Sequence, residues 1–232
     1  MVGDSLAGGL SHLSFPSHLA RMLPGWSLSV SARGGDTLAG VGNRLKALLS
    51  HSHPDAVILE AGANDILLPY LEKRGGLWRR LVKRLTAGGN LPARDPSSFE
   101  ALLAQILESL PGGSRSVILT TIPCLGEDPD SQLNMAGERY NLAITEAASK
   151  RGFRLADTGK AFREVLSRLD DPSPYLMDDF ASLFIDTLRA LTPRAAYQLS
   201  GRRGLVLTLD GVHPNPLGAE ILARTVVEAV TG

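Results

Sequence analysis

Gly3-Asp4-Ser5 opens a series of four short motifs that continues with Gly35-Asp36 and Gly62-Ala63-Asn64-Asp65 and ends with Asp210-Gly211-Val212-His213-Pro214. In this order the motifs supply a nucleophile, three groups able to donate to an oxyanion, and an acid–histidine pair. These are the parts that an acyl-transfer site needs. Each motif alone is a common turn sequence, so the prediction rests on the ordered set.

Ser5 is the predicted nucleophile, because a serine hydroxyl beside a base can attack an acyl carbon. Gly3 permits a tight turn, and the pattern over Leu6–Met22 predicts a helix directly after it. The Ser5 N–H would then lie at a helix N-terminus, where it can help to hold an anion. For an isolated motif, the competing interpretation is a helix cap made by Ser5 with Asp4.

His213 is the predicted base. It follows Asp210 by three residues, in a loop before a predicted helix over Leu217–Val230. At this spacing the carboxylate can accept from the imidazole Nδ1–H, set the tautomer and stabilise the imidazolium. The competing interpretation is a surface histidine beside an aspartate that caps a turn.

Three donors are predicted for the oxyanion of a tetrahedral intermediate. They are the side-chain amide of Asn64, the backbone N–H of Gly35 and the backbone N–H of Ser5. Gly35 has no side chain, so a substrate can approach closely. The competing interpretations are an Asx-turn at Asn64 and a turn glycine at Gly35.

The motifs resemble those of the SGNH hydrolase superfamily, also called GDSL esterases and lipases. The family takes its name from a serine, a glycine, an asparagine and a histidine, one in each of four conserved sequence blocks. The resemblance assigns these positions to Ser5, Gly35, Asn64 and His213, with Asp210 as the third triad member. The resemblance runs along most of the chain. It implies a serine esterase that forms an acyl-enzyme and needs no cofactor or metal. It does not identify the substrate, because the family includes lipid esterases, thioesterases, lysophospholipases and sugar deacetylases.

Composition is that of an ordinary globular protein. The chain has 232 residues, of which 44% are hydrophobic and 21% charged, and its formal net charge is zero. We therefore expect one domain over residues 1–232 and no general attraction to nucleic acid, while the resemblance implies a small-molecule ester as partner. No apolar run is long enough to span a bilayer. The single cysteine, Cys124, is expected to be a small buried residue.

Strand and helix patterns alternate, which favours a parallel sheet covered on both faces. The resemblance refines this α/β prediction to a three-layer α/β/α sandwich, flavodoxin-like, with strand order 2-1-3-4-5. The predicted strands are Ser27–Ser31, Ala56–Glu60, Val117–Thr121 and Phe153–Ala156; the predicted helices are Leu6–Met22, Leu38–Leu49, Ser98–Leu110, Leu133–Lys150, Pro174–Ala190 and Leu217–Val230.

The first strand looks truncated, because only Met1 and Val2 precede Gly3. Its loss would leave a gap in the middle of the sheet with unpaired backbone groups on both sides. We expect either a chain shortened at its N-terminus or another segment in this position. No signal peptide is visible, and a missing segment leaves the compartment open.

Two insertions are predicted, near residues 67–97 and 170–204. The first is basic and carries apolar residues at helical spacing around Trp78. It is either a lid that makes weak contact with an anionic lipid interface or, as we favour, a helix packed on its own domain. The second presents a broad apolar face that either walls an acyl pocket or packs in the core.

Hydrolysis of a carboxylic ester is the expected activity. The alternatives within the class are carbohydrate O-deacetylation and thioester cleavage. A non-catalytic ligand-binding protein of the same fold is the alternative from another class, and the presence of all the motif residues disfavours it. Neither GxGxxG after a strand nor GxxxxGK[ST] occurs, so nucleotide binding is not favoured.

Overall fold

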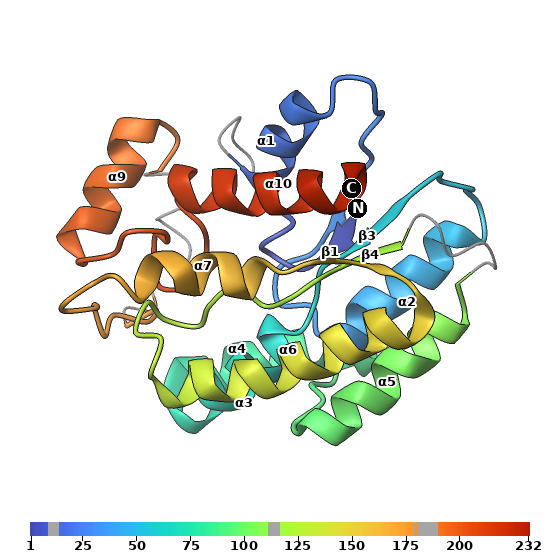
Figure 1. Ribbon diagram of the computed structural model, residues 1–232. Coiled ribbons are helices and arrows are strands. Elements are labelled where there is room, and N and C mark those ends of the chain that lie inside the picture. Colours follow the sequence, from blue (N-terminus) through green and yellow to red (C-terminus); the bar gives the residue numbers. More distant parts are fainter. Residues whose placement is uncertain (9–13, 111–116, 179, 181–189) are drawn as a thin grey trace.

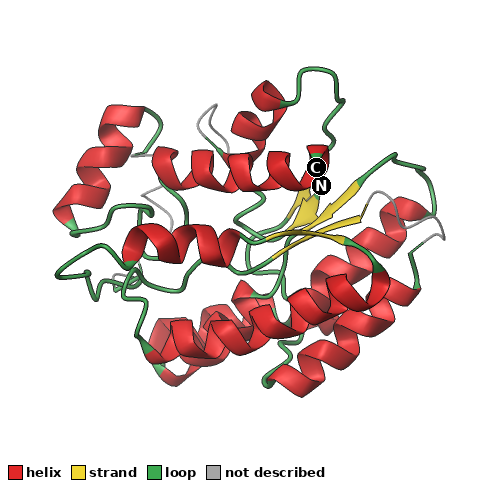
Figure 2. Cartoon of the chain, viewed as in Figure 1, coloured by secondary structure: helices red, strands yellow, loops and turns green. Residues whose placement is uncertain are grey.

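The computed structural model describes residues 1–8, 14–110, 117–178, 180 and 190–232. Parallel strands form a five-stranded sheet in the order β2-β1-β3-β4-β5, and helices cover both of its faces (Figures 1 and 2). This confirms the predicted α/β fold and strand order. The strands are β1 (Val2–Gly3), β2 (Ser31–Ala32), β3 (Val57–Leu59), β4 (Val117–Thr120) and β5 (Arg154–Ala156).

Alternation along the central strands creates two separate cores. Leu59 and Leu119 belong to one cluster of buried side chains, which includes residues of α2, α3, α5 and α6. Ile58 and Ile118 point to the other face and join a cluster with residues of α1, α7 and α10. Because successive strand side chains point to opposite faces, each strand residue helps to bury one of the two helical layers.

The helices fall where apolar periodicity and capping residues place them. Asn215 shows the pattern, because its side chain accepts from Leu217 N–H at 3.0 Å and Gly218 N–H at 3.1 Å at the start of α10. The helices are α1 (Phe15–Met22), α2 (Leu38–Leu49), α3 (Ala63–Lys73), α4 (Gly76–Leu85), α5 (Pro96–Glu108), α6 (Gln132–Arg151), α7 (Thr158–Leu166), α9 (Pro193–Arg202) and α10 (Pro216–Thr231), with a 3-10 turn at Ala87–Gly89.

Two predicted helices differ from the structure. Of the helix predicted over Leu6–Met22, the part from Phe15 is helical, and residues 9–13 lie outside the described residues. Leu6 to Gly8 form a turn in which Gly8 N–H donates to Ser5 O at 3.1 Å. Of the helix predicted over Pro174–Ala190, residues 174–178 are not helical, and most of the remainder lies outside the described residues. The helices α3, α7 and α9 were not predicted as separate elements.

The centre of the sheet is occupied by β1 although this strand has only two residues. Val2 pairs with Ser31 of β2 on one side and Leu59 of β3 on the other, and Glu60 N–H donates to Val2 O at 3.0 Å. The central position of the sheet is therefore filled, by a strand as short as the sequence predicted. The segment that fills it leads directly into the first motif, so Ser5 lies just beyond the carboxyl end of the central strand.

The first predicted insertion forms α3 and α4, and α4 packs on the body of the protein. Trp78 and Val82 are buried, and the Trp78 ring contacts Phe180 edge-on with centroids 5.0 Å apart. This burial favours the packed-helix interpretation over a lid. Contact with a lipid interface stays a prediction for the exposed face of α4, which carries Leu77 and four basic residues, Arg79, Arg80, Lys83 and Arg84.

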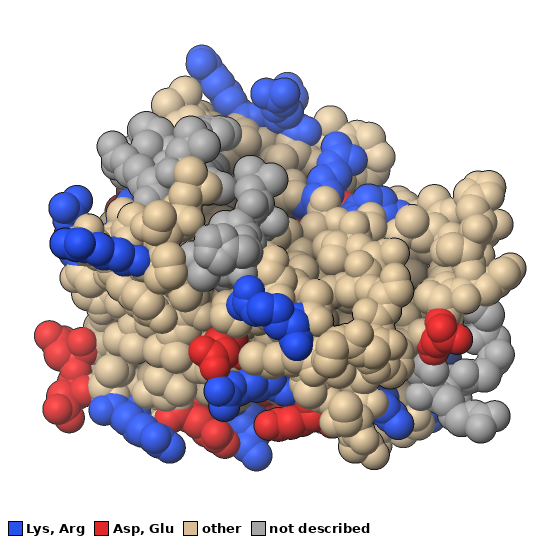
Figure 3. All heavy atoms as spheres, turned by 90° about the horizontal axis from the view of Figure 1, so that it is seen from above, with Lys and Arg blue, Asp and Glu red and all other residues tan. Residues whose placement is uncertain are grey.

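Charge is spread over the surface. On the face shown in Figure 3, basic and acidic side chains are interleaved along the lower edge, in keeping with a net charge of zero. Within the described ranges, no helix is both long and apolar enough to cross a membrane.

Candidate active site

Ser5, His213 and Asp210 are brought together at the carboxyl end of the sheet. His213 Nε2 lies 3.0 Å from Ser5 Oγ, and His213 Nδ1 lies 2.7 Å from Asp210 Oδ2. Ser5 follows β1 directly, whereas the other two residues lie in the loop before α10. The geometry is that of a nucleophile, a base and an acid in hydrogen-bonded sequence.

Asp210 is buried and held in place by its own loop. Its Oδ1 accepts from the backbone N–H of His213 at 2.8 Å and of Val212 at 3.0 Å. Burial by itself would raise the pKa of this carboxyl, but the imidazole of His213 and these hydrogen bonds lower the pKa below its usual value. Asp210 is therefore a fixed anion behind His213.

The three predicted oxyanion donors also converge. Asn64 Nδ2 donates to Asp4 Oδ2, beside Ser5, and to the Asp36 carbonyl oxygen, beside Gly35, each at 3.0 Å. The amide thus connects the first and second motifs. Asn64 lies in the first turn of α3, close to the N-terminal end of a helix, where backbone dipoles favour an anion.

The backbone segments of Ser5 and Gly35 lie close together. A Cβ on Gly34 would lie 3.9 Å from Ser5 Cβ, so the two loops are neighbours. Within the part of the chain that the structure describes, the N–H groups of Ser5 and Gly35 have no hydrogen-bond acceptor. Backbone donors are rarely left unpaired, so both are suited to bind an oxyanion.

Ser5 is held by a turn rather than by a helix. Leu6 N–H donates to Asp4 Oδ1 at 2.8 Å, which closes an Asx-turn around Ser5. The prediction that a helix begins directly after Ser5 is therefore wrong for Leu6 to Gly8. The positive N-terminal end of a helix comes from α3 instead, at Asn64.

Two buried carboxyls lie beneath the nucleophile. Asp4 N–H donates to Glu60 Oε2 at 2.9 Å, and both side chains are almost inaccessible to solvent. Burial and then the charge of Glu60 raise the pKa of Asp4, and burial raises the pKa of Glu60. A Cβ on Gly3 would lie 2.5 Å from Glu60 Oε2, so this glycine is required for space.

Glu127 is a further residue of the site that sequence reasoning missed. Its buried carboxylate accepts from the N–H groups of Val206, Leu207 and Thr208 at 2.6, 2.8 and 2.6 Å, and from Thr208 Oγ1 at 2.6 Å. Gly126 N–H also donates to Gly211 O at 2.7 Å. The loop after β4 therefore anchors the chain that leads into Asp210 and His213.

Asn90 ties the end of α4 to the second motif. Its Oδ1 accepts from Thr37 N–H at 2.8 Å, and its Nδ2 donates to Gly35 O at 2.9 Å and Leu85 O at 2.8 Å. Gly35 has φ +78, and a Cβ there would lie 2.8 Å from Leu85 Cδ1. Both the backbone and the space around Gly35 thus exclude a side chain.

Arg44 secures the other side of this loop. Its Nε donates to Asp36 Oδ2 at 2.7 Å, and its two terminal nitrogens donate to Ser31 O at 2.7 Å and Gly3 O at 2.6 Å. The guanidinium therefore links the ends of β1 and β2 to the second motif. An isolated arginine within an amphipathic helix pattern gave no indication of this role.

Asp65 holds two segments near Asn64. Its oxygens accept from Leu38 N–H at 2.8 Å and Ala93 N–H at 2.7 Å, and burial raises the pKa of the carboxyl to about 7.

Cys124 is buried as predicted, and burial raises the pKa of its thiol, with Glu127 adding to the shift. This thiol is not poised as a second nucleophile.

Known structures share this fold. AlAXEase, an acetyl xylan esterase, aligns at 20% identity with a TM-score of 0.65, over 99% of this chain and 97% of its own. A variant of Axe2, an acetyl xylan esterase from Geobacillus stearothermophilus, aligns at 19% identity with a TM-score of 0.61, over 99% of this chain and 92% of its own. A member of the lipolytic protein G-D-S-L family from Veillonella parvula DSM 2008 aligns at 14% identity with a TM-score of 0.60, over 99% of this chain and 95% of its own. No curated protein sequence matches the chain.

The fold and the motif geometry define an ester hydrolase of the SGNH type. Residues 1–221 match the GDSL-like lipase/acylhydrolase family, so the chain belongs to that family. This confirms the predicted resemblance and the enzyme class. A triad and an oxyanion hole are typical of the family.

Proposed function

We propose that the protein is a serine esterase that hydrolyses carboxylic esters through an acyl-enzyme on Ser5. The observation that carries the proposal is the pair of contacts made by His213, 3.0 Å to Ser5 Oγ and 2.7 Å to Asp210 Oδ2. With the proton on Nδ1, the imidazole donates to Asp210 and its Nε2 accepts from the Ser5 hydroxyl.

Acylation begins when Ser5 Oγ attacks the carbonyl carbon while His213 Nε2 takes the hydroxyl proton. The imidazolium gives that proton to the leaving alcohol as the bond between carbon and alcohol oxygen breaks. Water then attacks the acyl-enzyme, again losing a proton to His213, and the carboxylic acid leaves as Ser5 Oγ regains its proton. Asp210, ionised and buried, stabilises the imidazolium in each half of the reaction.

The negative carbonyl oxygen of each tetrahedral intermediate is proposed to bind the N–H groups of Ser5 and Gly35 and the amide of Asn64. The two N–H groups lack acceptors in the described structure, which supports their role. The Asn64 amide donates to Asp4 and Asp36, so we propose that an oxyanion shares or replaces one of these acceptors.

Acetyl esters of carbohydrates are the proposed substrates within this class. Two of the structural relatives are acetyl xylan esterases. The cavity beside the site is lined by charged and hydroxyl-bearing side chains as well as apolar ones, and these polar groups favour a sugar over a lipid. Thioester cleavage and long-chain esters are the alternatives that an assay has to separate.

The test is hydrolysis of p-nitrophenyl esters from acetate to long acyl chains, followed by acetylated xylo-oligosaccharides. We expect Ser5→Ala to lower kcat by about 10⁴-fold or more, and acetate to be preferred. Ser97→Ala, which alters an exposed serine of α5, is the control. Folded wild-type protein that hydrolyses none of these esters and is not labelled by a fluorophosphonate would favour the non-catalytic binding role.

A further inference from the structure

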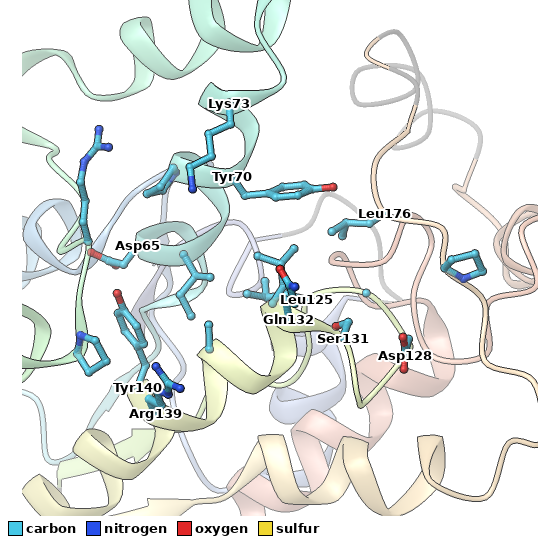
Figure 4. A pocket seen from close by; sticks show the side chains of 18 of the residues that line it. Asp65, Tyr70, Lys73, Leu125, Asp128, Ser131, Gln132, Arg139, Tyr140 and Leu176 are labelled. Atoms are coloured by element: carbon cyan, nitrogen blue, oxygen red, sulfur yellow. The ribbon is translucent and has the colours of Figure 1, made fainter.

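A cavity of about 680 Å³ lies between α3 and α6, beside the candidate active site. Figure 4 shows Tyr70 and Lys73 extending from α3 on one side and Gln132 and Arg139 on α6 on the other. The volume is in the range of sites for small ligands, roughly 300–1,000 Å³. Ser5 and His213 do not line it.

The walls of the cavity are bonded to the proposed catalytic loop. Gly126, which lines the cavity, donates to Gly211 O at 2.7 Å. The next lining segment includes Leu176, and Met177 N–H beside it donates to Asp210 O at 2.8 Å. The segments that line the cavity are therefore hydrogen-bonded to the loop that carries the acid–histidine pair.

The acidic side chains around the cavity are already engaged. Each accepts a hydrogen bond or forms an ion pair within the protein, so carboxylate oxygens around the cavity are already used as acceptors. Asp65 accepts from Leu38 and Ala93, Asp95 accepts from Ser98, Asp128 accepts from Asp130, and Asp178 pairs with Arg74.

Among the described residues of the lining, the unengaged polar groups are mostly donors. Lys73 and Arg139, on opposite walls, have no ion-pair or hydrogen-bond partner within the described ranges. The Tyr70 hydroxyl and the Gln132 amide are likewise without a partner there. Two cations and two neutral hydrogen-bonding groups around one cavity are suited to a ligand that carries both a carboxylate and hydroxyl groups.

Apolar side chains complete the lining. Ile66, Leu125 and Leu133 belong to it, and the Tyr70 ring lies across the cavity in Figure 4. Such surfaces can cover the C–H faces of a sugar ring while the polar groups bind its oxygens.

We infer that this cavity binds an acidic sugar, a carboxylate-bearing unit of the carbohydrate whose ester is cleaved at Ser5. The inference deepens the proposed function and rests on it for the link to catalysis. Binding itself is independent of turnover and can be measured without it.

The test is calorimetric titration of the Ser5→Ala protein with methyl β-D-glucuronide and methyl β-D-glucoside, which differ only at C6, a carboxylate in the first and a hydroxymethyl group in the second. We expect the glucuronide to bind at least tenfold more tightly. The double variant Lys73→Gln/Arg139→Gln should remove this preference. The matched control Lys83→Gln/Arg84→Gln makes the same change in net charge on the exposed face of α4 and should retain it.

Equal affinity for the two sugars would overturn the inference, as would a preference that survives in the double variant. Displacement of the glucuronide by an equal concentration of inorganic phosphate would assign the two cations to a phosphate group and would also overturn it. Absence of sugar binding in a protein that hydrolyses p-nitrophenyl acetate defeats this inference alone. Selective glucuronide binding without any ester hydrolysis defeats the proposed function alone.

Discussion

Asn64 Nδ2 lies 3.0 Å from Asp4 Oδ2, so the amide proposed for the oxyanion site is hydrogen-bonded to the residue that precedes the nucleophile. Its second hydrogen bond, to Asp36 O, extends this link to the loop of Gly35. The same amide therefore aligns two of the donors and is itself proposed as the third. Its acceptors are buried, so a change at Asn64 affects both the charge balance and the geometry of the site.

Replacement of Asn64 should separate its proposed role as an oxyanion donor from its structural role in joining the loops of Asp4 and Asp36. Asn64→Ala removes one of the proposed oxyanion donors, and we expect kcat for p-nitrophenyl acetate to fall by about 10²- to 10³-fold with a small change in KM. Asn64→Asp should be worse in both kcat and melting temperature, because it places a carboxylate against Asp4. The exposed Asn43→Ala serves as control. Equal losses in the Ala and Asp variants would contradict the expected effect of a second carboxylate beside Asp4.

Glu127→Gln tests how the acid–histidine loop is anchored. An amide has one acceptor oxygen where the carboxylate has two, and its NH₂ would face a backbone N–H. We expect the free energy of unfolding in urea to fall by about 1–3 kcal/mol, and kcat to fall several-fold. Glu164→Gln, at an exposed ion pair on α7, should change neither. Unaltered kcat in Glu127→Gln would mean that Asp210 and His213 hold their positions unaided.

Replacement of two helical glycines by alanine should change the stability of the protein in opposite directions. A Cβ at Gly137 of α6 meets nothing within 4 Å outside its own helix, so Gly137→Ala should stabilise the protein by roughly 0.5–1 kcal/mol. A Cβ at Gly218 of α10 would lie 2.2 Å from the carbonyl oxygen of Leu207, so Gly218→Ala should destabilise it by about 1–3 kcal/mol. Thermal unfolding of both variants checks the pair, and a stabilising Gly218→Ala would refute the packing argument.

Asp65 should make stability depend on pH. Burial raises the pKa of its carboxyl to about 7, whereas an unfolded aspartate loses its proton near pH 4. Between these values the folded state binds the extra proton, so the contribution of Asp65 to stability falls as pH rises, by up to roughly 1.4 kcal/mol per pH unit. The side-chain amide of the Asp65→Asn variant cannot titrate. The unfolding free energy of wild type minus that of the variant should therefore fall from pH 5 to pH 7, and a constant difference would contradict the shift.

The sequence alone determined the class of the protein. Strand and helix periods repeat along the chain, so the parallel sheet and most of the flanking helices could be predicted from local pattern. The motif order predicted Ser5, Gly35, Asn64, Asp210 and His213 as site residues, because acyl transfer requires these residue types in fixed roles.

Only the tertiary structure decided how those residues are held. Glu127, Arg44 and Asn90 carry no motif, and each acts by binding backbone groups that are remote in sequence. The turn after Ser5 and the two-residue strand β1 likewise depend on neighbours that contribute hydrogen bonds across the sheet. Local pattern reports the preferences of a segment, whereas the pairing of buried donors and acceptors between distant segments is settled only when the chain packs.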